Sequence, residues 1–366
     1  MDSANIAQAR LANQLLGRDK KSTPGEVVDW LGAVQAQDFA AAKWAIGMRL
    51  HQATDAEVEK AYNAGQILRT HVMRPTWHFL SPQDIRAVQA LTARRVRAGN
   101  ASMLRKLELD GRLLSRCHRA LAAALRDGQH LTRTELSSRL EAARIQARGQ
   151  RLAYILMDAE LEALICSGPR KGKQFTYALL EERVPKARPL SPEEALGRWA
   201  RRYFLGHGPA QAKDFAWWSG LTLREAQRAI ELSKGSLLRE TISGNTYWRS
   251  PGGDGPEPDA GKPGGGGGAL LLSIYDEYNI AYRDRGALGP ERHLERLISM
   301  GNALTSVLIL GGIIAGTWKR VLARAGVELA VSPFHTLRKA EKEAIRAAAS
   351  AYGEFLGLPV TLHYAE

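Results

Sequence analysis

The chain has 366 residues, enough for two or three domains, and 45% of them are apolar, which excludes a disordered chain. Lysine and arginine total 51 against 38 for aspartate and glutamate, a formal charge of +13 that favours a polyanionic partner. Two cysteines exclude a disulfide framework and a four-cysteine metal site. The sequence shows no signal peptide and no apolar run near the roughly 20 residues of a membrane span, so we expect a cytoplasmic protein with no membrane partner.

Residues 1–92 are predicted to form helices followed by a hairpin. Helices are expected over residues 4–16, 23–34, 40–50 and 55–62, and Asp55 is the expected cap of the last one. The second begins with a capping box, because Thr23 precedes Pro24 and Glu26 lies three residues after it. Strands over 67–73 and 76–80 are joined by Arg74-Pro75 and form the hairpin. Helices followed by a hairpin make a winged-helix unit.

The same order of elements returns twice, in residues 93–186 and 187–250. The second unit has expected helices over residues 116–126, 132–144 and 150–164, and strands over 164–167 and 175–179. The third has expected helices that begin at Ser191, Pro209 and Leu221, and strands over 237–241 and 246–249. We therefore predict three winged helix-turn-helix units in tandem, although their mutual sequence identity is too low to show a repeat.

A glycine- and proline-rich stretch separates these units from the C-terminal part. Residues 251–268 contain nine glycines and four prolines, which predicts a flexible surface connection. They do not form a phosphate-binding loop, because no Lys-Ser or Lys-Thr follows the glycines. Beyond them, strands are expected over residues 269–274, 305–310, 313–320, 327–331 and 360–364, with one amphipathic helix over 339–356. Residues 269–366 are thus predicted to be a β-rich domain closed by a helix, and the fold class is mostly α with β (α+β).

The positive charge is concentrated in one part of the chain. Residues 94–151 contain 14 lysines and arginines against five acidic residues. Such a stretch is either a solvated helical surface or a surface that faces phosphates, and the excess of arginine over lysine favours the second. The candidate phosphate contacts in this region and in the basic turn of the second hairpin are Arg94, Arg95, Arg148, Arg170, Lys171 and Lys173.

The sequence Gln35-Ala36-Gln37 places two amides two residues apart at the end of a predicted helix. If the backbone is extended there, both side chains lie on the same face. Alone, such a pattern is typical of amides that cap carbonyl groups. Asp38 follows as the nearest carboxylate and either assists in chemistry or caps the next helix.

The first hairpin carries further candidates. Arg69, His71 and Arg74 are placed to contact phosphate, with Arg74 at the tip. Trp77 is either a core residue or a wedge between stacked bases, and His78 is either a core residue or a site residue.

Four sequence blocks carry a family resemblance. Residues 35–38, 68–80, 273–285 and 307–320 resemble, in the same order, the bacterial winged-helix DNA glycosylases of the AlkZ-like type. The resemblance implies three tandem winged helices and a C-terminal β domain around a DNA channel. It also implies excision of bulky or N-alkylated purines from DNA, including the unhooking of interstrand crosslinks. The Gln-x-Gln signature of that family matches Gln35 and Gln37, whereas the YcaQ-like sister branch has Gln-x-Asp.

Two neutral amides suit this chemistry. A purine alkylated at N7 is already cationic, so its departure needs no general acid. The remaining tasks are to stabilise the oxocarbenium-like sugar and to position a water, and amide dipoles and hydrogen bonds can serve both. We therefore expect a monofunctional enzyme that needs no metal and no cofactor, and that fails on neutral bases that are poor leaving groups.

Other interpretations remain open at this stage. A non-enzymatic winged-helix regulator would bind a palindrome as a dimer, whereas three units in one chain favour a monomer on duplex DNA. A family member that binds lesions without cutting them is a further alternative. The carboxylates and arginines of residues 275–285 form either a paired-carboxylate site or a buried salt-bridge network, and the network is favoured.

Overall fold

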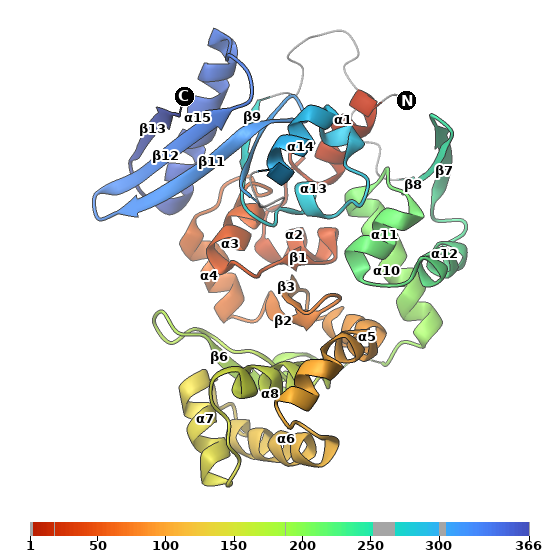
Figure 1. Ribbon diagram of the computed structural model, residues 1–366, viewed down its shortest axis with the longest axis vertical. Coiled ribbons are helices and arrows are strands. Elements are labelled where there is room, and N and C mark those ends of the chain that lie inside the picture. The colour runs from red at the N-terminus through yellow and green to blue at the C-terminus, as the bar shows by residue number, and fades with distance from the viewer. Residues whose placement is uncertain (1–2, 18, 187, 252–267, 300–304, 366) are drawn as a thin grey trace.

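The computed structural model describes residues 3–17, 19–186, 188–251, 268–299 and 305–365. Helices and four small sheets alternate along these residues, which confirms the predicted α+β class. Figure 1 shows the N-terminal residues, coloured red, in the middle of the molecule, between the C-terminal sheet and the green helices and above the yellow ones. No helix in the described ranges is long and apolar enough to cross a membrane.

The N-terminal unit contains four helices and a three-stranded sheet. The helices are α1 (Ser3–Asn13), α2 (Pro24–Leu31), α3 (Phe39–Gly47) and α4 (Asp55–Asn63). The strands are β1 (Val34–Gln35), β2 (Leu68–Val72) and β3 (Thr76–Leu80), in the order β1-β3-β2. The capping box predicted at Thr23 is present, with the Glu26 side chain bonded to the Thr23 backbone.

Two predictions in this unit are wrong. Helix α2 does not continue to Val34, because Gly32 adopts φ 79°, a conformation that ends a helix, and the chain then extends into β1. Helix α4 is capped by Thr54, whose hydroxyl accepts a hydrogen bond from the Glu57 N–H, and Asp55 is its first residue. The glutamine pair therefore starts on a strand and does not end a helix.

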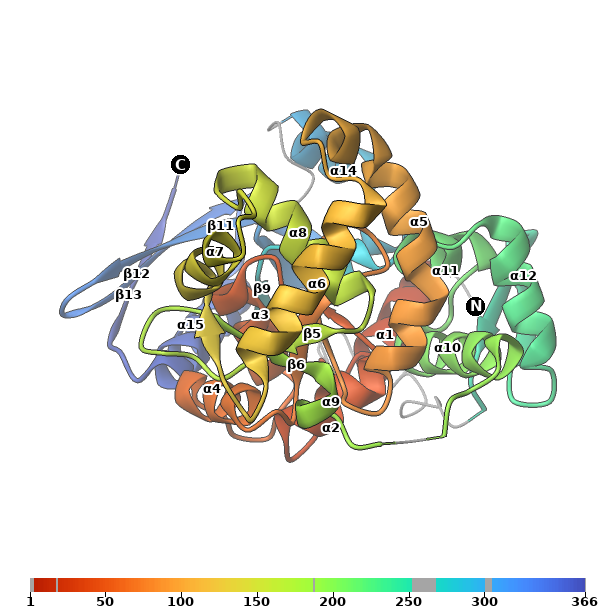
Figure 2. The same cartoon turned by 90° about the horizontal axis from the view of Figure 1, so that it is seen from below.

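The second unit packs around a core of its own. It contains α5 (Ile85–Lys106), α6 (Gly111–Leu125), α7 (Arg133–Ala142), α8 (Gly149–Leu161), the short α9 (Leu180–Arg183), and strands β4 (Leu131–Thr132), β5 (Ile165–Ser167) and β6 (Thr176–Leu179). The strands form a sheet in the order β4-β6-β5. Figure 2 shows α5, α6 and α8 together on the underside of the molecule. The 22-residue helix α5 was not predicted from the sequence.

The third unit contains helices α10 (Pro192–His207), α11 (Ala212–Ser219) and α12 (Leu223–Leu232), followed by the hairpin β7 (Leu238–Ile242) and β8 (Asn245–Arg249). Helix α11 begins at Ala212 and not at the predicted Pro209. Ala210 lies between these two positions and exchanges two backbone hydrogen bonds with Trp248, at 2.8 and 3.0 Å. It is therefore held in a bridge to the hairpin.

The C-terminal part is a five-stranded sheet covered by one helix. Its elements are β9 (Ala269–Leu272), α13 (Glu277–Ile280), the 3₁₀ helix η1 (Gly286–Leu288), α14 (Glu291–Ser299), β10 (Val307–Leu310), β11 (Ile313–Ala323), β12 (Gly326–Pro333), α15 (Lys339–Leu356) and β13 (Val360–Tyr364). The strand order is β13-β12-β11-β10-β9, and only the β12–β13 pair is parallel among the described strands. The prediction for residues 251–268 falls mostly on residues 252–267, which lie outside the described ranges.

This C-terminal sheet is not an independent body, because it shares a core with the N-terminal unit. The indole N–H of Trp44 in α3 donates to the Leu271 carbonyl of β9 over 2.8 Å. The same indole packs against Tyr352 and Phe355 of α15, with ring centroids 4.9 and 5.1 Å away. Segments more than 200 residues apart in sequence thus fix the position of strand β1 and the residues that follow it.

Candidate active site

The glutamine pair occupies the end of strand β1. Gln35 pairs with His78 of β3, and the Ala36 N–H donates to the Trp77 carbonyl over 2.7 Å. The backbone is therefore extended through Gln35 and Ala36, and the chain then bends at Gln37 and Asp38 before helix α3. Gln35 is 8% exposed, whereas Gln37 is exposed. The pair thus combines one amide fixed in the protein with one that faces solvent.

The β2–β3 hairpin holds both amides through their oxygens. A guanidinium nitrogen of Arg74, at the hairpin tip, donates to Gln35 Oε1 over 3.1 Å, and the Trp77 N–H donates to Gln37 Oε1 over 3.3 Å. Both partners can only donate, so they orient the amides, with each oxygen toward the hairpin and each NH₂ group away from it. Each carbonyl oxygen keeps a second lone pair for another donor.

Asp38 acts as a helix cap in this structure. Its Oδ1 accepts a hydrogen bond from the Ala41 N–H over 2.9 Å at the start of α3. One of the two sequence-based interpretations of Asp38 was a cap, and the geometry agrees with it. The carboxylate is exposed next to Gln37.

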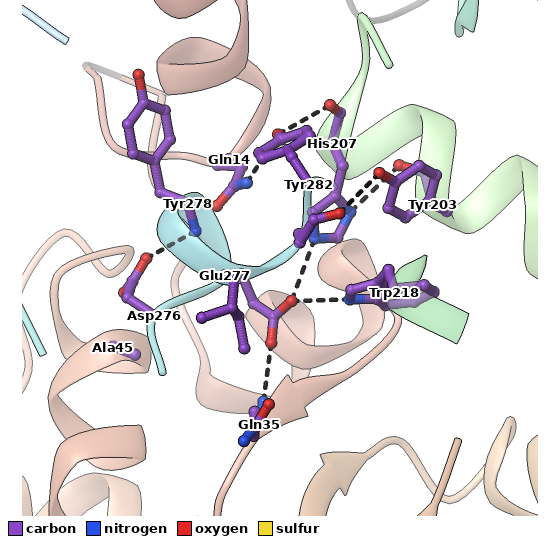
Figure 3. A network of polar contacts seen from close by, with 12 residues as sticks. Gln14, Gln35, Ala45, Tyr203, His207, Trp218, Asp276, Glu277, Tyr278 and Tyr282 are labelled. Atoms are coloured by element: carbon purple, nitrogen blue, oxygen red, sulfur yellow. Dashed lines mark hydrogen bonds and ion pairs between the residues drawn. The ribbon is translucent and has the colours of Figure 1, made fainter. Parts of the chain in front are cut away.

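A buried carboxylate, Glu277 of α13, lies next to Gln35 and is bonded to it (Figure 3). Its Oε1 accepts from the Gln35 N–H over 2.8 Å, and its Oε2 accepts from the Trp218 indole N–H over 2.8 Å. Nε2 of His207 lies 3.6 Å from Oε2. Burial raises the pKa of the Glu277 carboxyl, but the His207 ring and the Gln35 N–H outweigh it and leave that pKa below its ordinary value. Glu277 is therefore an ionised group inside the protein.

The neighbouring carboxylate, Asp276, belongs to a structural network. Its two oxygens accept from the two terminal nitrogens of Arg49, each over 2.9 Å, and both side chains are fully buried. Arg49 also donates to the Gln14 carbonyl over 2.9 Å and to the Gln14 side chain over 3.0 Å. The network interpretation of residues 275–285 is thus confirmed for Asp276.

Two of the hairpin residues expected to contact phosphate lie inside the protein. Arg69 is 8% exposed, donates to the Ala36 carbonyl over 2.9 Å and stacks over the Trp77 ring at 4.2 Å. His71 is buried and bonded to Glu160 of α8. Neither side chain is in a position to reach a phosphate group, and both connect the hairpin to its surroundings instead.

The hairpin tip packs tightly on helix α11. Arg74 donates to the Trp217 carbonyl over 3.3 Å, and the Trp217 indole beside it is 46% exposed. Gly220 ends α11 with φ 73°, and a Cβ there would lie 2.4 Å from the Met73 carbonyl oxygen. Only glycine allows this approach, which sets the position of Arg74.

His78 is a fully buried partner of Gln35 across the sheet. Burial lowers the pKa of His78 to about 3, with the Arg74 charge adding to the shift, so its ring is neutral at physiological pH. Nδ1 lies 3.1 Å from the Thr76 carbonyl, which can only accept, so Nδ1 carries the hydrogen. Of the two interpretations for His78, the structure places it in the interior.

The basic stretch of residues 94–151 forms exposed faces of α5, α6 and α7. Exposed basic side chains without a carboxylate partner in the described ranges include Arg94, Arg105, Lys106, Arg112, Arg119, Arg126, Arg139 and Arg144. Other candidates are paired: Arg95 with Glu225 at 2.6 Å, and Arg148 with Glu141 at 2.6 Å.

The basic turn of the second unit is also partly neutralised. Arg170 lies 3.4 Å from Glu59, and Lys171 lies 3.1 Å from Glu135. Lys173 is exposed and has no carboxylate partner in the part of the chain that the structure describes. Arg94 and Lys173 are therefore the predicted contacts whose charge stays free for a ligand.

Sequence reasoning did not connect Glu277 with Gln35, nor Trp217 with the hairpin tip. Gln35 and Glu277 are 242 positions apart, and no local pattern signals their contact. No group of three or more His, Cys, Asp or Glu within the described residues has the arrangement of a metal site.

Three comparisons with known proteins show which family and which fold this chain is similar to. A family model described as DNA glycosylase AlkZ-like matches residues 28–355. A relative from Streptomyces sahachiroi, named interstrand DNA cross-link repair glycosylase, is 26% identical over 356 residues, which cover 93% of this chain and 94% of the relative. The solved structure of the Streptomyces sahachiroi DNA glycosylase AlkZ covers 99% of both chains with a TM-score of 0.79 and 21% identity, which shows a shared fold. The resemblance that four sequence blocks indicate is confirmed, and the chain belongs to the AlkZ-like DNA glycosylase family.

Proposed function

We propose that this protein is a monofunctional DNA glycosylase that hydrolyses the N-glycosidic bond of N7-alkylated purines in duplex DNA, including bulky and crosslinked adducts. The observation that carries the proposal is the pair Gln35 and Gln37, whose amide oxygens are both held by donors of the same hairpin, in a chain of this family. The similarity to a relative named for crosslink repair supports the substrate class.

The chemistry needs little proton transfer. Alkylation at N7 makes the purine cationic, so the bond from N9 to C1′ breaks with its electron pair going to the base, which leaves neutral. Water then adds to C1′ of the oxocarbenium-like sugar and releases a proton to solvent. The free lone pairs of the two amide oxygens can accept the hydrogens of this water, so that its own lone pair faces C1′. The same oxygens place negative partial charge near the developing cation.

Binding of the duplex is a separate task in this proposal. We assign the exposed faces of α5–α7, with Arg94, and the turn with Lys173 to phosphate contacts that orient the DNA. The three helix-and-hairpin units act as winged helices, over residues 1–92, 93–186 and 187–250, and the protein works as a monomer in the cytoplasm. The catalytic side chains are uncharged and contribute nothing to the net charge of +13.

Base release tests the proposal. Purified protein is incubated with a duplex that contains a single N7-methylguanine, and abasic sites are scored by alkaline cleavage; a duplex with an N7-linked crosslink is the second substrate. We expect release by the wild type and none by the Gln35→Ala/Gln37→Ala variant, which retains salt-dependent DNA binding. A folded dimer that binds one preferred palindrome and releases no base would instead support the alternative, a non-enzymatic winged-helix regulator.

A further inference from the structure

Glu277 is a buried ionised carboxylate without a cationic lysine or arginine partner among the described residues. Such a group is costly to bury, because a charge removed from water needs compensating contacts. Its neighbour Asp276 illustrates the usual solution, a bidentate pair with Arg49. Glu277 accepts hydrogen bonds from N–H groups in place of such a pair. A salt bridge to lysine or arginine therefore does not explain why this carboxylate is buried here.

The donors to Glu277 come from different parts of the fold (Figure 3). One is the backbone N–H of Gln35 in β1, and another is the indole N–H of Trp218 in α11. The His207 ring at the end of α10 lies 3.6 Å away. Glu277 therefore ties the strand that carries the glutamine pair to the helices of the third unit.

The contact with Gln35 satisfies a backbone group that the sheet leaves unpaired. Strand β1 lies at the edge of the sheet β1-β3-β2, and the next residue, Ala36, makes the bond to β3. The Gln35 N–H bonds to the Glu277 carboxylate instead, over 2.8 Å. A bond to an ionised acceptor is stronger and more directional than a bond to water or to a neutral group.

We propose that Glu277 is a positioning residue, which fixes the backbone of Gln35 while Arg74 fixes its side-chain oxygen. Gln35 is thereby held at both ends, and its amide has one orientation toward the sugar and the attacking water. This inference rests on the proposed function. A displacement of about 1 Å in a group that orients reactants can lower a rate by roughly 100-fold, which makes such fixation valuable.

The test compares two neutralised carboxylates of the same segment. Glu277→Gln keeps the size of the side chain but turns an NH₂ group toward one of the two donors. We expect its single-turnover rate of N7-methylguanine release, at saturating DNA, to fall by roughly 10- to 100-fold. The affinity for DNA stays within about threefold of wild type, and hydrogen exchange of the segment 33–38 becomes faster.

Asp276→Asn is the matched control, since it neutralises a fully buried carboxylate that does not contact Gln35. We expect a lower melting temperature, but a single-turnover rate within about threefold of wild type when the assay is run well below that temperature. A wild-type rate for Glu277→Gln, or equal losses of rate in the two variants, would overturn the inference, because the second outcome indicates general destabilisation.

Glu277→Asp keeps the test decisive if Glu277→Gln does not fold. It retains the negative charge but withdraws the oxygens by one carbon–carbon bond, so the rate falls while DNA affinity stays unchanged; a wild-type rate would contradict the inference. Failure of the proposed function is a distinct outcome, because then the wild type itself releases no base from either substrate. Loss in Glu277→Gln relative to an active wild type addresses the positioning role alone.

Discussion

Arg74 has two possible roles, a contact to phosphate or the orientation of the Gln35 side chain, and an experiment can distinguish them. The sequence places it at a hairpin tip, where it would contact phosphate, whereas the structure shows its guanidinium bonded to the Gln35 side chain at 3.1 Å and to the Trp217 carbonyl at 3.3 Å. Arg74→Met removes these donors and keeps much of the side-chain volume. We expect the Gln35 amide to lose its fixed orientation, because no other donor in the described residues bonds to its oxygen.

The size of the effect follows from the bond that is lost. A hydrogen bond to a charged group contributes about 1.5–3 kcal/mol. At about 1.4 kcal/mol for each factor of ten, the single-turnover rate should fall roughly 10- to 150-fold. Arg74→Lys keeps the charge but not the planar pair of donors, so it should recover only part of the rate.

The assay measures base release at saturating DNA together with the dissociation constant at several salt concentrations. An orienting role lowers the rate and leaves the salt dependence of binding unchanged. A phosphate contact would weaken binding and reduce the salt slope by about 0.9 while the rate at saturation is kept. That second pattern would refute the orientation of Gln35 by Arg74.

Three further predictions concern the supports of the site. Gly220→Ala forces a side chain into φ 73° and against the Met73 oxygen, so it should lower stability by about 1–3 kcal/mol and slow base release; an unchanged melting temperature would contradict this packing. His78 has a folded-state pKa of about 3, below the roughly 6.5 of an unfolded chain. Its contribution to stability is therefore complete above pH 6.5 and is lost as the pH falls toward 3, by about 2 kcal/mol at pH 5, and unfolding of His78→Gln should depend less on pH in that range. Arg94→Ala should reduce the salt slope of DNA binding by about 0.9. The control Arg188→Ala, at an exposed arginine that is paired with Glu194, should leave the slope unchanged. Equal slopes for the two variants would contradict a phosphate contact by Arg94.

Local sequence patterns located the elements whose signals are local. Helix α2 begins with the capping box expected at Thr23, and α7 and α10 begin next to Thr132 and Ser191, where the sequence predicts their starts. The bounds of α15 and β13 agree with the predicted ranges 339–356 and 360–364. In each case the signal lies within a few residues of the element, so no tertiary information is needed.

Helix α5 was not predicted because its start carries no such signal. Asp84 precedes it without a side-chain capping bond, and the helix buries a stripe that includes the polar residues Gln89 and Thr92. The hydroxyl of Thr92 accepts from the Met73 N–H over 3.0 Å, so this position is stabilised by the hairpin. Gln89 likewise donates to the Glu160 carbonyl over 2.6 Å, so the polar residues of this buried stripe are explained by tertiary contacts.

The site itself could be predicted only in part. The motif identifies Gln35 and Gln37, but their surroundings come from distant segments, with Arg74 at a separation of 39 residues and Glu277 at 242. The expected phosphate contacts Arg69 and His71 have the right residue types on the right hairpin. Their burial depends on packing against Trp77 and helix α8, which no pattern within the hairpin reveals.

The most direct measurement is the release of N7-methylguanine from a duplex by the wild type and by the Gln35→Ala/Gln37→Ala variant, at equal folded concentration and saturating DNA. We expect abasic sites with the wild type, and none above the uncatalysed background with the variant, while both bind the duplex with the same salt dependence. Release by the variant at the wild-type rate would contradict the assignment of the glutamine pair. No release by a folded wild type that binds the duplex would contradict the glycosylase function itself.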